Sequence, residues 1–282
     1  MYTSFYGLRE KPFALSPNPR FLFLGESHRE ALAHLLYGIE QGEGFIAITG
    51  EVGTGKTTLC RTLLERLGSD TEVAFLFNPS RSGTELLQTI SLELGLPAGG
   101  LTRRELGDQL NRYLLTRKKQ GRRVLLIVDE SQNLSSSTLE QIRLLSNLET
   151  NTEKLLQIVL TGQPELREML ARPELAPLRQ RVALEHHVEP LREDEVGDYL
   201  HHRIEVAGGR YAEIFEPGAD SVFFSFSAGC PRLINLLADR ALLSAFARQE
   251  RPVRTATLEQ KAKEIADQQA RPLGGMPVGR PR

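Results

Sequence analysis

Residues 50–57 read Gly-Glu-Val-Gly-Thr-Gly-Lys-Thr, which matches the phosphate-binding pattern Gly-x-x-x-x-Gly-Lys-Thr at every fixed position. Residues 45–49 form an apolar, β-branched run typical of a buried strand, and residues 58–67 have the apolar spacing of an amphipathic helix. In a strand–loop–helix of this kind, the glycines allow backbone N–H groups to point at the phosphates of a nucleotide. Lys56 adds a positive charge, and the Thr57 hydroxyl can hold Mg²⁺. The sequence therefore predicts a nucleoside triphosphate site built from Gly50, Glu51, Val52, Gly53, Thr54, Gly55, Lys56, Thr57 and Thr58.

The composition is that of an ordinary soluble globular protein, with 282 residues, of which 40% are hydrophobic and 25% charged. A chain of this length accommodates one large domain and a smaller companion. The formal net charge of −1 gives no overall attraction for nucleic acid or anionic membrane, although a local basic patch stays open. Cys60 and Cys230 are expected to be free thiols in a reducing compartment. Neither a membrane-spanning run nor a signal peptide is recognisable, so we expect a cytoplasmic protein, with a peripheral position at the inner membrane as the alternative.

Apolar runs alternate with helical patterns along the first two thirds of the chain. The expected strands are residues 45–49, 73–77, 124–128, 155–160 and 183–188, and the expected helices that follow them include residues 84–94, 103–120 and 136–148. Residues 124–128 show no polar alternation, as expected of a parallel strand that is covered on both faces. The alternation predicts an α/β fold with a parallel, doubly wound sheet flanked by helices.

Four segments are expected along the chain. Residues 1–44 begin with aromatic residues and prolines and are expected to lead into an α/β core at residues 45–190. From residue 191 to residue 268 only helical patterns remain, which predicts a small all-helical C-terminal domain. Residues 269–282 are rich in proline and glycine and have little apolar surface to bury, so a disordered tail is predicted there.

An acidic pair, Asp129-Glu130, follows the strand predicted at residues 124–128. Because the carboxyl ends of parallel strands lie at one edge of a sheet, this pair is expected beside the phosphate loop. Asp129 can orient the ligands of a Mg²⁺ ion that Thr57 also holds, and Glu130 can polarise the attacking water. Glu130 therefore favours a hydrolase over a protein that only binds nucleotide.

Gln163 follows the next strand, where a polar side chain would lie beside the γ-phosphate; the alternative is that Gln163 only caps the helix that begins at Pro164. Arg179 and Arg181 precede the last expected strand, and an arginine supplied across a subunit boundary can stabilise charge on the transferred phosphoryl group. Arg181 is the preferred arginine finger and Arg179 the reserve. Arg232, at the start of a helix in the C-terminal domain, could reach back to the γ-phosphate.

Taken together, these motifs resemble the AAA+ ATPases, specifically the ExeA/GspA/MshM-like branch of general secretion and pilus biogenesis, which is related to TniB/TnsC-like ATPases. The resemblance covers about residues 1–265. A phosphate loop alone is unspecific, whereas this ordered set is specific. Besides the loop, the matching motifs are residues 5–8, 11–13, 17–21, 42–45, 162–166, 178–181 and 231–235.

The resemblance implies a P-loop core with a helical lid, ATP and Mg²⁺ as ligands, and a role for each candidate residue. Lys56 and Thr57 would serve Walker A, and Asp129 and Glu130 would serve Walker B. Gln163 would be sensor 1, Arg181 or Arg179 the finger, and Arg232 sensor 2. Ser131 stands where an alanine is usual after the acidic pair, a small change that should be tolerated.

We expect a Mg²⁺-dependent ATPase that forms a ring-like homo-oligomer and couples ATP state to the assembly or remodelling of a secretion, pilus or surface-polysaccharide system. The resembled secretion ATPases continue into a membrane span and a peptidoglycan-binding domain that this sequence does not encode, which favours a pilus or polysaccharide role over secretin insertion. The alternative is a DNA-binding regulator of the TniB/TnsC transposition type, which would require the basic residues at 103–123 to converge on one exposed face. A second alternative is a nucleotide switch that does not hydrolyse ATP.

Overall fold

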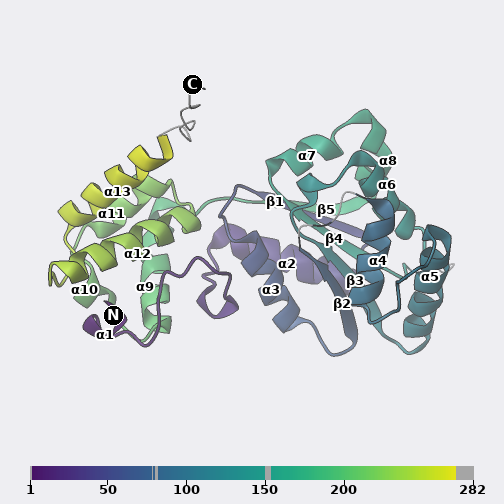
Figure 1. Cartoon of the computed structure of the whole chain (residues 1–282), viewed down its shortest axis with the longest axis horizontal. Coiled ribbons are helices and arrows are strands. Elements are labelled where there is room, and N and C mark those ends of the chain that lie inside the picture. The colour runs from purple at the N-terminus through teal and green to yellow at the C-terminus, as the bar shows by residue number, and fades with distance from the viewer. Residues whose placement is uncertain (1, 78, 80–81, 150–153, 271–282) are drawn as a thin grey trace, which may run out of the picture. The chain divides into compact units, whose positions relative to one another are not determined.

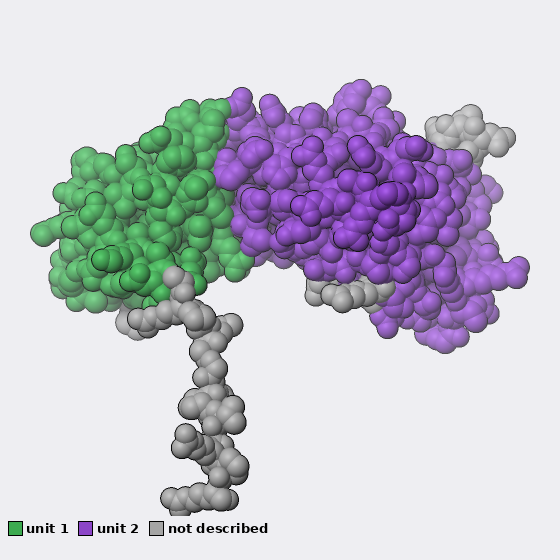
Figure 2. Space-filling view, turned by 90° about the horizontal axis from the view of Figure 1, so that it is seen from above, with its two compact units in different colours: residues 1–16, 191–282 green, residues 17–190 purple. Residues whose placement is uncertain are grey.

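The structure is a computed structural model that describes residues 2–77, 79, 82–149 and 154–270. The chain divides into two compact units, which Figure 2 shows in different colours. The core unit comprises Pro17–Pro190, and the helical unit comprises Met1–Ser16 together with Leu191–Arg282. The chain therefore passes between the units twice, after Ser16 and after Pro190.

A five-stranded parallel sheet forms the centre of the core unit (Figure 1). Its strands are β1 (Phe45–Gly50), β2 (Thr71–Leu76), β3 (Arg123–Val128), β4 (Gln157–Gly162) and β5 (Val182–Val188), in the spatial order β2-β3-β4-β1-β5. Every residue of β1 and β4 is buried, because helices cover both faces of the sheet. The predicted parallel α/β sheet is confirmed.

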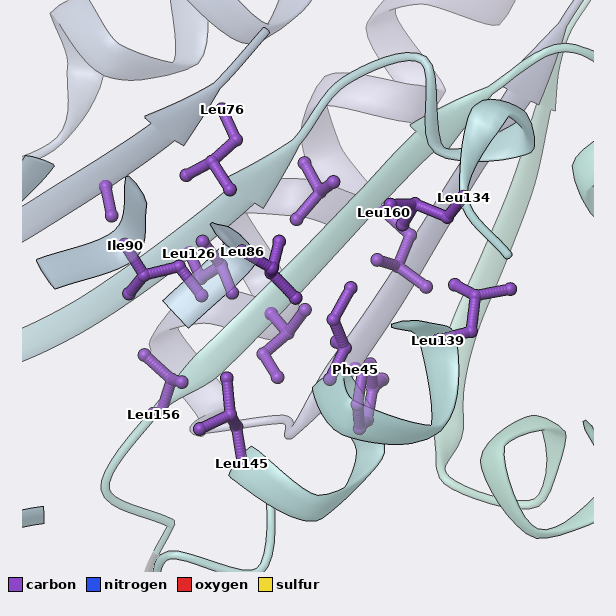
Figure 3. Packing of buried hydrophobic residues seen from close by; sticks show 14 of the residues in the cluster. Phe45, Leu76, Leu86, Ile90, Leu126, Leu134, Leu139, Leu145, Leu156 and Leu160 are labelled. Carbon is purple, nitrogen blue, oxygen red and sulfur yellow. The ribbon is translucent and has the colours of Figure 1, made fainter. Parts of the chain in front are cut away.

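Successive residues of each strand pack on opposite faces of the sheet. On one face, Ile46 and Ile48 join a hydrophobic cluster with α2 (Glu26–Gln41) and α3 (Lys56–Arg66). On the other face, Phe45 and Ala47 join the larger cluster of Figure 3. The helices that contribute to this larger cluster include α4 (Gly83–Glu93), α5 (Arg103–Lys119), α6 (Ser136–Leu145) and α7 (Pro164–Leu170).

The carboxyl ends of β1, β3 and β4 lie at one edge of the sheet. β4 lies between the other two strands, with Leu160 paired to Val128 and Thr161 paired to Ile48. The phosphate loop, the acidic pair with η2 (Ser131–Asn133), and Gln163 follow these three strands directly. The shorter elements of the core unit are η1 (Pro19–Phe21), η3 (Pro173–Leu175) and α8 (Ala176–Arg179).

The helical unit contains the all-helical C-terminal region that the sequence predicts. Its elements are α1 (Tyr2–Phe5), α9 (Glu193–Val206), α10 (Tyr211–Ile214), α11 (Ala219–Ser227), α12 (Pro231–Ala247) and α13 (Thr255–Ala270). Residues 269 and 270 of the predicted tail end α13, and the remainder of that tail lies outside the described residues. None of the helices in the described ranges combines the length and the apolar character that crossing a membrane requires.

The sequence suggested that residues 1–44 lead into the core, but residues 2–16 pack in the helical unit. Phe13 is fully buried, and its ring lies 6.2 Å from that of Phe215. The Arg203 guanidinium donates to the Pro12 carbonyl (Nε to O, 2.6 Å), and the Tyr6 hydroxyl donates to the Glu250 carbonyl at 3.0 Å. An apolar and aromatic pattern shows that a segment is buried but not which core buries it, so the division after Ser16 was not predicted.

Candidate nucleotide-binding site

The phosphate loop joins β1 to α3 and requires glycine at three positions. Gly53 and Gly55 have left-handed φ angles of 86° and 102°, which side chains with a Cβ disfavour. Gly50 lies so close to β5 that a Cβ there would be 2.7 Å from the Val188 carbonyl oxygen. Thr54 is fully buried, and its hydroxyl donates to the Glu51 carbonyl at 2.9 Å. The glycine positions and the Thr54–Glu51 hydrogen bond therefore define part of the shape of the loop.

Lys56 is the first residue of α3 and directly follows the glycines of this loop. Its side chain is only 6% exposed, and Nζ donates to the carbonyl oxygens of Gly50 at 2.7 Å and Glu51 at 2.8 Å. The ammonium group thus lies against the loop backbone, at the positive end of the α3 dipole. A buried cation in this position is suited to bind the phosphates of a nucleotide.

Asp129 connects the phosphate loop to the strands beside it. Its Oδ2 accepts from the Thr57 hydroxyl at 2.7 Å, and its Oδ1 accepts from the Thr161 hydroxyl at 2.6 Å and from the Glu130 N–H at 3.0 Å. The carboxylate is 2% exposed, so these three donors compensate its burial. Thr161 was not among the sequence candidates, although its place at the end of β4 was a usable signal.

The oxygen atoms of Thr57 and Asp129 fit Mg²⁺, which prefers oxygen ligands and retains several waters. Among the described residues, no group of three or more His, Cys, Asp or Glu side chains forms a self-sufficient metal site. A Mg²⁺ ion held by Thr57 and Asp129 would therefore take its other ligands from nucleotide phosphates and water.

Glu130 lies beside this pair with a left-handed φ of 52°. Its Oε2 accepts from Gln132 Nε2 at 2.5 Å and from Gln163 Nε2 at 3.2 Å. Gln132 also accepts from the Gln163 N–H at 3.1 Å, so the three side chains form one network. Gln163 is the N-cap residue of α7 but makes no side-chain capping bond, which disfavours the capping alternative. Gln132 was missed because a glutamine in a short loop carries no pattern.

Cys60 lies under the site on α3 and is fully buried. Burial raises the pKa of its thiol, and the nearby negative charge of Asp129 raises that pKa further. The thiol therefore stays neutral and packs as a small apolar group between α3 and the sheet.

The candidate arginines differ in their surroundings. Arg181 is half-buried, and its Nη1 donates to Ser146 Oγ at 2.8 Å and Asn147 Oδ1 at 2.5 Å, beyond the end of α6. Arg179, the last residue of α8, is exposed and makes no ion pair or hydrogen bond through its side chain with any part of the chain that the structure describes. Arg232 is an exposed residue in the first turn of α12, within the helical unit.

The basic residues at 103–123 do not form a continuous stripe. Glu72 on β2 pairs with Arg117 (3.0 Å) and Arg122 (2.6 Å), and Asp70 pairs with Arg123 (2.8 Å). The remaining basic residues, Arg103, Arg104, Arg112, Lys118 and Lys119, are exposed along α5 with the acidic Glu105 and Asp108 among them. This arrangement gives little support to the DNA-binding alternative.

Sequence reasoning also missed His28, which is 2% exposed in the first turn of α2. Its Nε2 lies 2.7 Å from the carbonyl oxygen of Thr54 in the phosphate loop. A signal was available, because His28 falls on the same helix face as Ala31 and Leu35, where an apolar residue is expected.

Comparisons with known proteins find related sequences. The AAA domain family matches residues 39–170. General secretion pathway protein A of Aeromonas hydrophila is 46% identical over 269 residues, which are 94% of this chain and 49% of that protein. The chain thus spans about half the length of this relative.

Solved structures share the fold. The ORC2 protein of Aeropyrum pernix, in its ADPNP–ADP complexes, superposes with a TM-score of 0.69 at 18% identity, covering 93% of this chain and 75% of that one. Cdc6p of Pyrobaculum aerophilum superposes with a TM-score of 0.69 at 17% identity, covering 92% of this chain and 72% of that one. At these identities the likeness concerns the fold alone.

Proposed function

The chain belongs to the AAA+ family, in the branch of general secretion pathway protein A, and on that premise we propose that it is a Mg²⁺-dependent ATPase. The observation that carries the proposal is the convergence of Lys56, Thr57, Asp129 and Glu130 at one edge of the sheet. A protein that only bound nucleotide would need the first three groups, but it would have no use for a carboxylate held beside them.

Each side chain has a task in this proposal. Lys56 and the loop N–H groups hold the phosphates, and Thr57 and Asp129 hold Mg²⁺, which neutralises charge on the phosphate oxygens. The Glu130 carboxylate orients the attacking water and accepts its proton. Gln132 and Gln163 fix the carboxylate through their bonds to Oε2.

We also propose that hydrolysis requires a second copy of the chain. Arg181 is engaged within its own chain by Ser146 and Asn147, whereas Arg179 is exposed. The structure therefore favours Arg179 over Arg181 as the finger that reaches a neighbour's nucleotide, which reverses the preference drawn from the sequence. Arg232 of the helical unit remains our candidate for sensing the γ-phosphate.

The biological role that we propose is assembly or remodelling of a secretion, pilus or surface-polysaccharide system, with the ATPase acting in the cytoplasm, where ATP is available, and peripherally at the inner membrane. This rests on the 46% identity to general secretion pathway protein A over 94% of the chain. The DNA-binding alternative is weakened by the pairing of Arg117, Arg122 and Arg123 with acidic residues.

Phosphate release from ATP tests the activity. The wild-type protein with Mg²⁺ should release phosphate, and Glu130→Gln should bind ATP with similar affinity but release almost none, because an amide cannot accept the proton. Equal rates for the two proteins would overturn the role of Glu130. Mobility shifts of DNA, with and without ATP at two salt concentrations, test the alternative, because binding through phosphate contacts must weaken as salt rises.

A further inference from the structure

His28 contacts the phosphate loop from a helix that carries none of the other candidate site residues. Its imidazole is buried in the first turn of α2, and Nε2 lies 2.7 Å from the Thr54 carbonyl oxygen. A carbonyl oxygen only accepts hydrogen bonds, so Nε2 must carry the hydrogen and donate. His28 therefore fixes the direction of the Thr54 carbonyl.

The direction of this carbonyl determines the direction of the next N–H group. The peptide between Thr54 and Gly55 is planar and trans, so its C=O and N–H bonds point in opposite directions. With the Thr54 carbonyl turned to His28, the Gly55 N–H points away from α2. Within the described chain this N–H donates to no backbone carbonyl, which leaves it available to an anion in the loop.

The Thr54–Gly55 peptide is followed by a glycine, whose backbone freedom would allow the peptide to turn over. Gly55 has a φ of 102° and therefore a wide choice of backbone conformations. The Thr54 side chain is tied to the Glu51 carbonyl at 2.9 Å, but that bond does not fix the peptide that follows Thr54. The His28 ring also fills the space next to Gly55, because a Cβ on Gly55 would lie 3.3 Å from Nε2.

We propose that His28 is a positioning residue for nucleotide binding, which holds the Thr54–Gly55 peptide with its N–H directed at the phosphates. This inference rests on the proposed ATP-binding function of the loop. His28 does not touch the nucleotide in this role. Its hydrogen bond keeps the Thr54–Gly55 peptide in the binding orientation before the nucleotide arrives. Nucleotide binding therefore does not have to supply the free energy of reorienting this peptide.

The test compares two substitutions of His28. His28→Leu replaces the imidazole with an apolar side chain of similar size that cannot donate a hydrogen bond. This variant should raise the dissociation constant for Mg·ATP roughly tenfold, as expected for the loss of one positioned hydrogen bond. His28→Gln places an amide N–H donor at a similar distance from the backbone and should restore most of the affinity. His28→Met replaces the leucine variant if that variant does not fold.

The control is His34→Leu on the same helix, because the ring of His34 lies 5.2 Å from that of His186 and not at the loop. Its affinity for Mg·ATP should equal that of the wild type. Isothermal titration gives the affinities, and thermal unfolding without nucleotide gives the stability of each variant.

Two results would overturn the inference: a leucine variant that loses thermal stability but keeps wild-type affinity, or a glutamine variant no better than leucine. Either would mean that His28 only fills space under the loop. Failure of the proposed function would look different, because the wild-type protein and the His34→Leu control would then also fail to bind Mg·ATP.

Discussion

Gln163 donates a hydrogen bond from its side-chain nitrogen to Oε2 of Glu130 over 3.2 Å, although the two residues follow different strands. The contact exists because β3 and β4 are parallel neighbours with Val128 paired to Leu160, so that their carboxyl ends coincide. The side chain that we propose to lie beside the γ-phosphate is thereby joined to the candidate base. Movement of Gln163 on nucleotide binding or hydrolysis would release or reorient the Glu130 carboxylate.

This bond predicts that Gln163→Ala lowers the turnover number at least tenfold while changing ATP affinity little, because hydrogen bonds to charged groups contribute about 1.5–3 kcal/mol. In a Glu130→Gln background the same substitution should cost much less, since the two residues act as a unit. Single-turnover hydrolysis in the four proteins measures this coupling. Glu165→Ala, an exposed change in the first turn of α7, is the control. Additive losses of turnover would show that Gln163 and Glu130 act independently.

The buried ammonium of Lys56 predicts a specific loss in Lys56→Ala. Without that cation the loop should no longer bind ATP tightly, because the phosphate charge is uncompensated. ATP at about 100 times its dissociation constant should stabilise the wild type by about 2.7 kcal/mol and the variant by much less. Isothermal titration and thermal unfolding with added Mg·ATP measure both effects. Unchanged affinity in the variant would remove the phosphate-loop assignment.

The sequence predicted the strands and helices well because their patterns are local. Residues 124–128 read as a covered strand, and β3 comprises Arg123–Val128. The start of β4 was less predictable, since Leu155 and Leu156 are buried but precede the strand at Gln157. Apolar character reports burial, while the strand boundary depends on pairing with neighbours, which no short stretch of sequence contains.

The same distinction applies to the site. Lys56, Thr57, Asp129 and Glu130 belong to motifs with fixed spacing, so the sequence could identify them. Thr161 contacts Asp129, Gln132 contacts Glu130, and His28 contacts Thr54 of the phosphate loop only because separate strands and a helix meet at one edge of the sheet. Their roles depend on tertiary contacts, and the engagement of Arg181 by Ser146 depends on such a contact too.

The burial of Phe13 predicts that the N-terminal segment stabilises the helical unit. Phe13→Ala should lower the free energy of unfolding of that unit by about 3–5 kcal/mol, the usual cost of removing a buried aromatic ring. Leu15→Ala, two residues away at a side chain that is 55% exposed, should change it by less than about 0.5 kcal/mol. Urea denaturation followed by circular dichroism compares the variants. Equal effects of both substitutions would argue that the segment does not belong to the core of that unit.

Arg179 predicts that hydrolysis is a property of the assembled protein. Arg179→Ala should reduce turnover far more than ATP affinity, because an arginine supplied across a subunit boundary contributes about 10³–10⁵ in rate where it has been measured. Arg181→Ala should instead act within its own chain, lowering stability through the lost bonds to Ser146 and Asn147. A mixing experiment tests whether the arginine acts across subunits. Arg179→Ala protein and Lys56→Ala protein, each nearly inactive alone, should recover part of the activity when mixed, because some interfaces then pair an intact phosphate loop with an intact finger. Light scattering must show that the two proteins assemble together. If the mixture made with Arg181→Ala recovers activity and the mixture made with Arg179→Ala does not, then Arg181 is the finger despite its bonds to the end of α6.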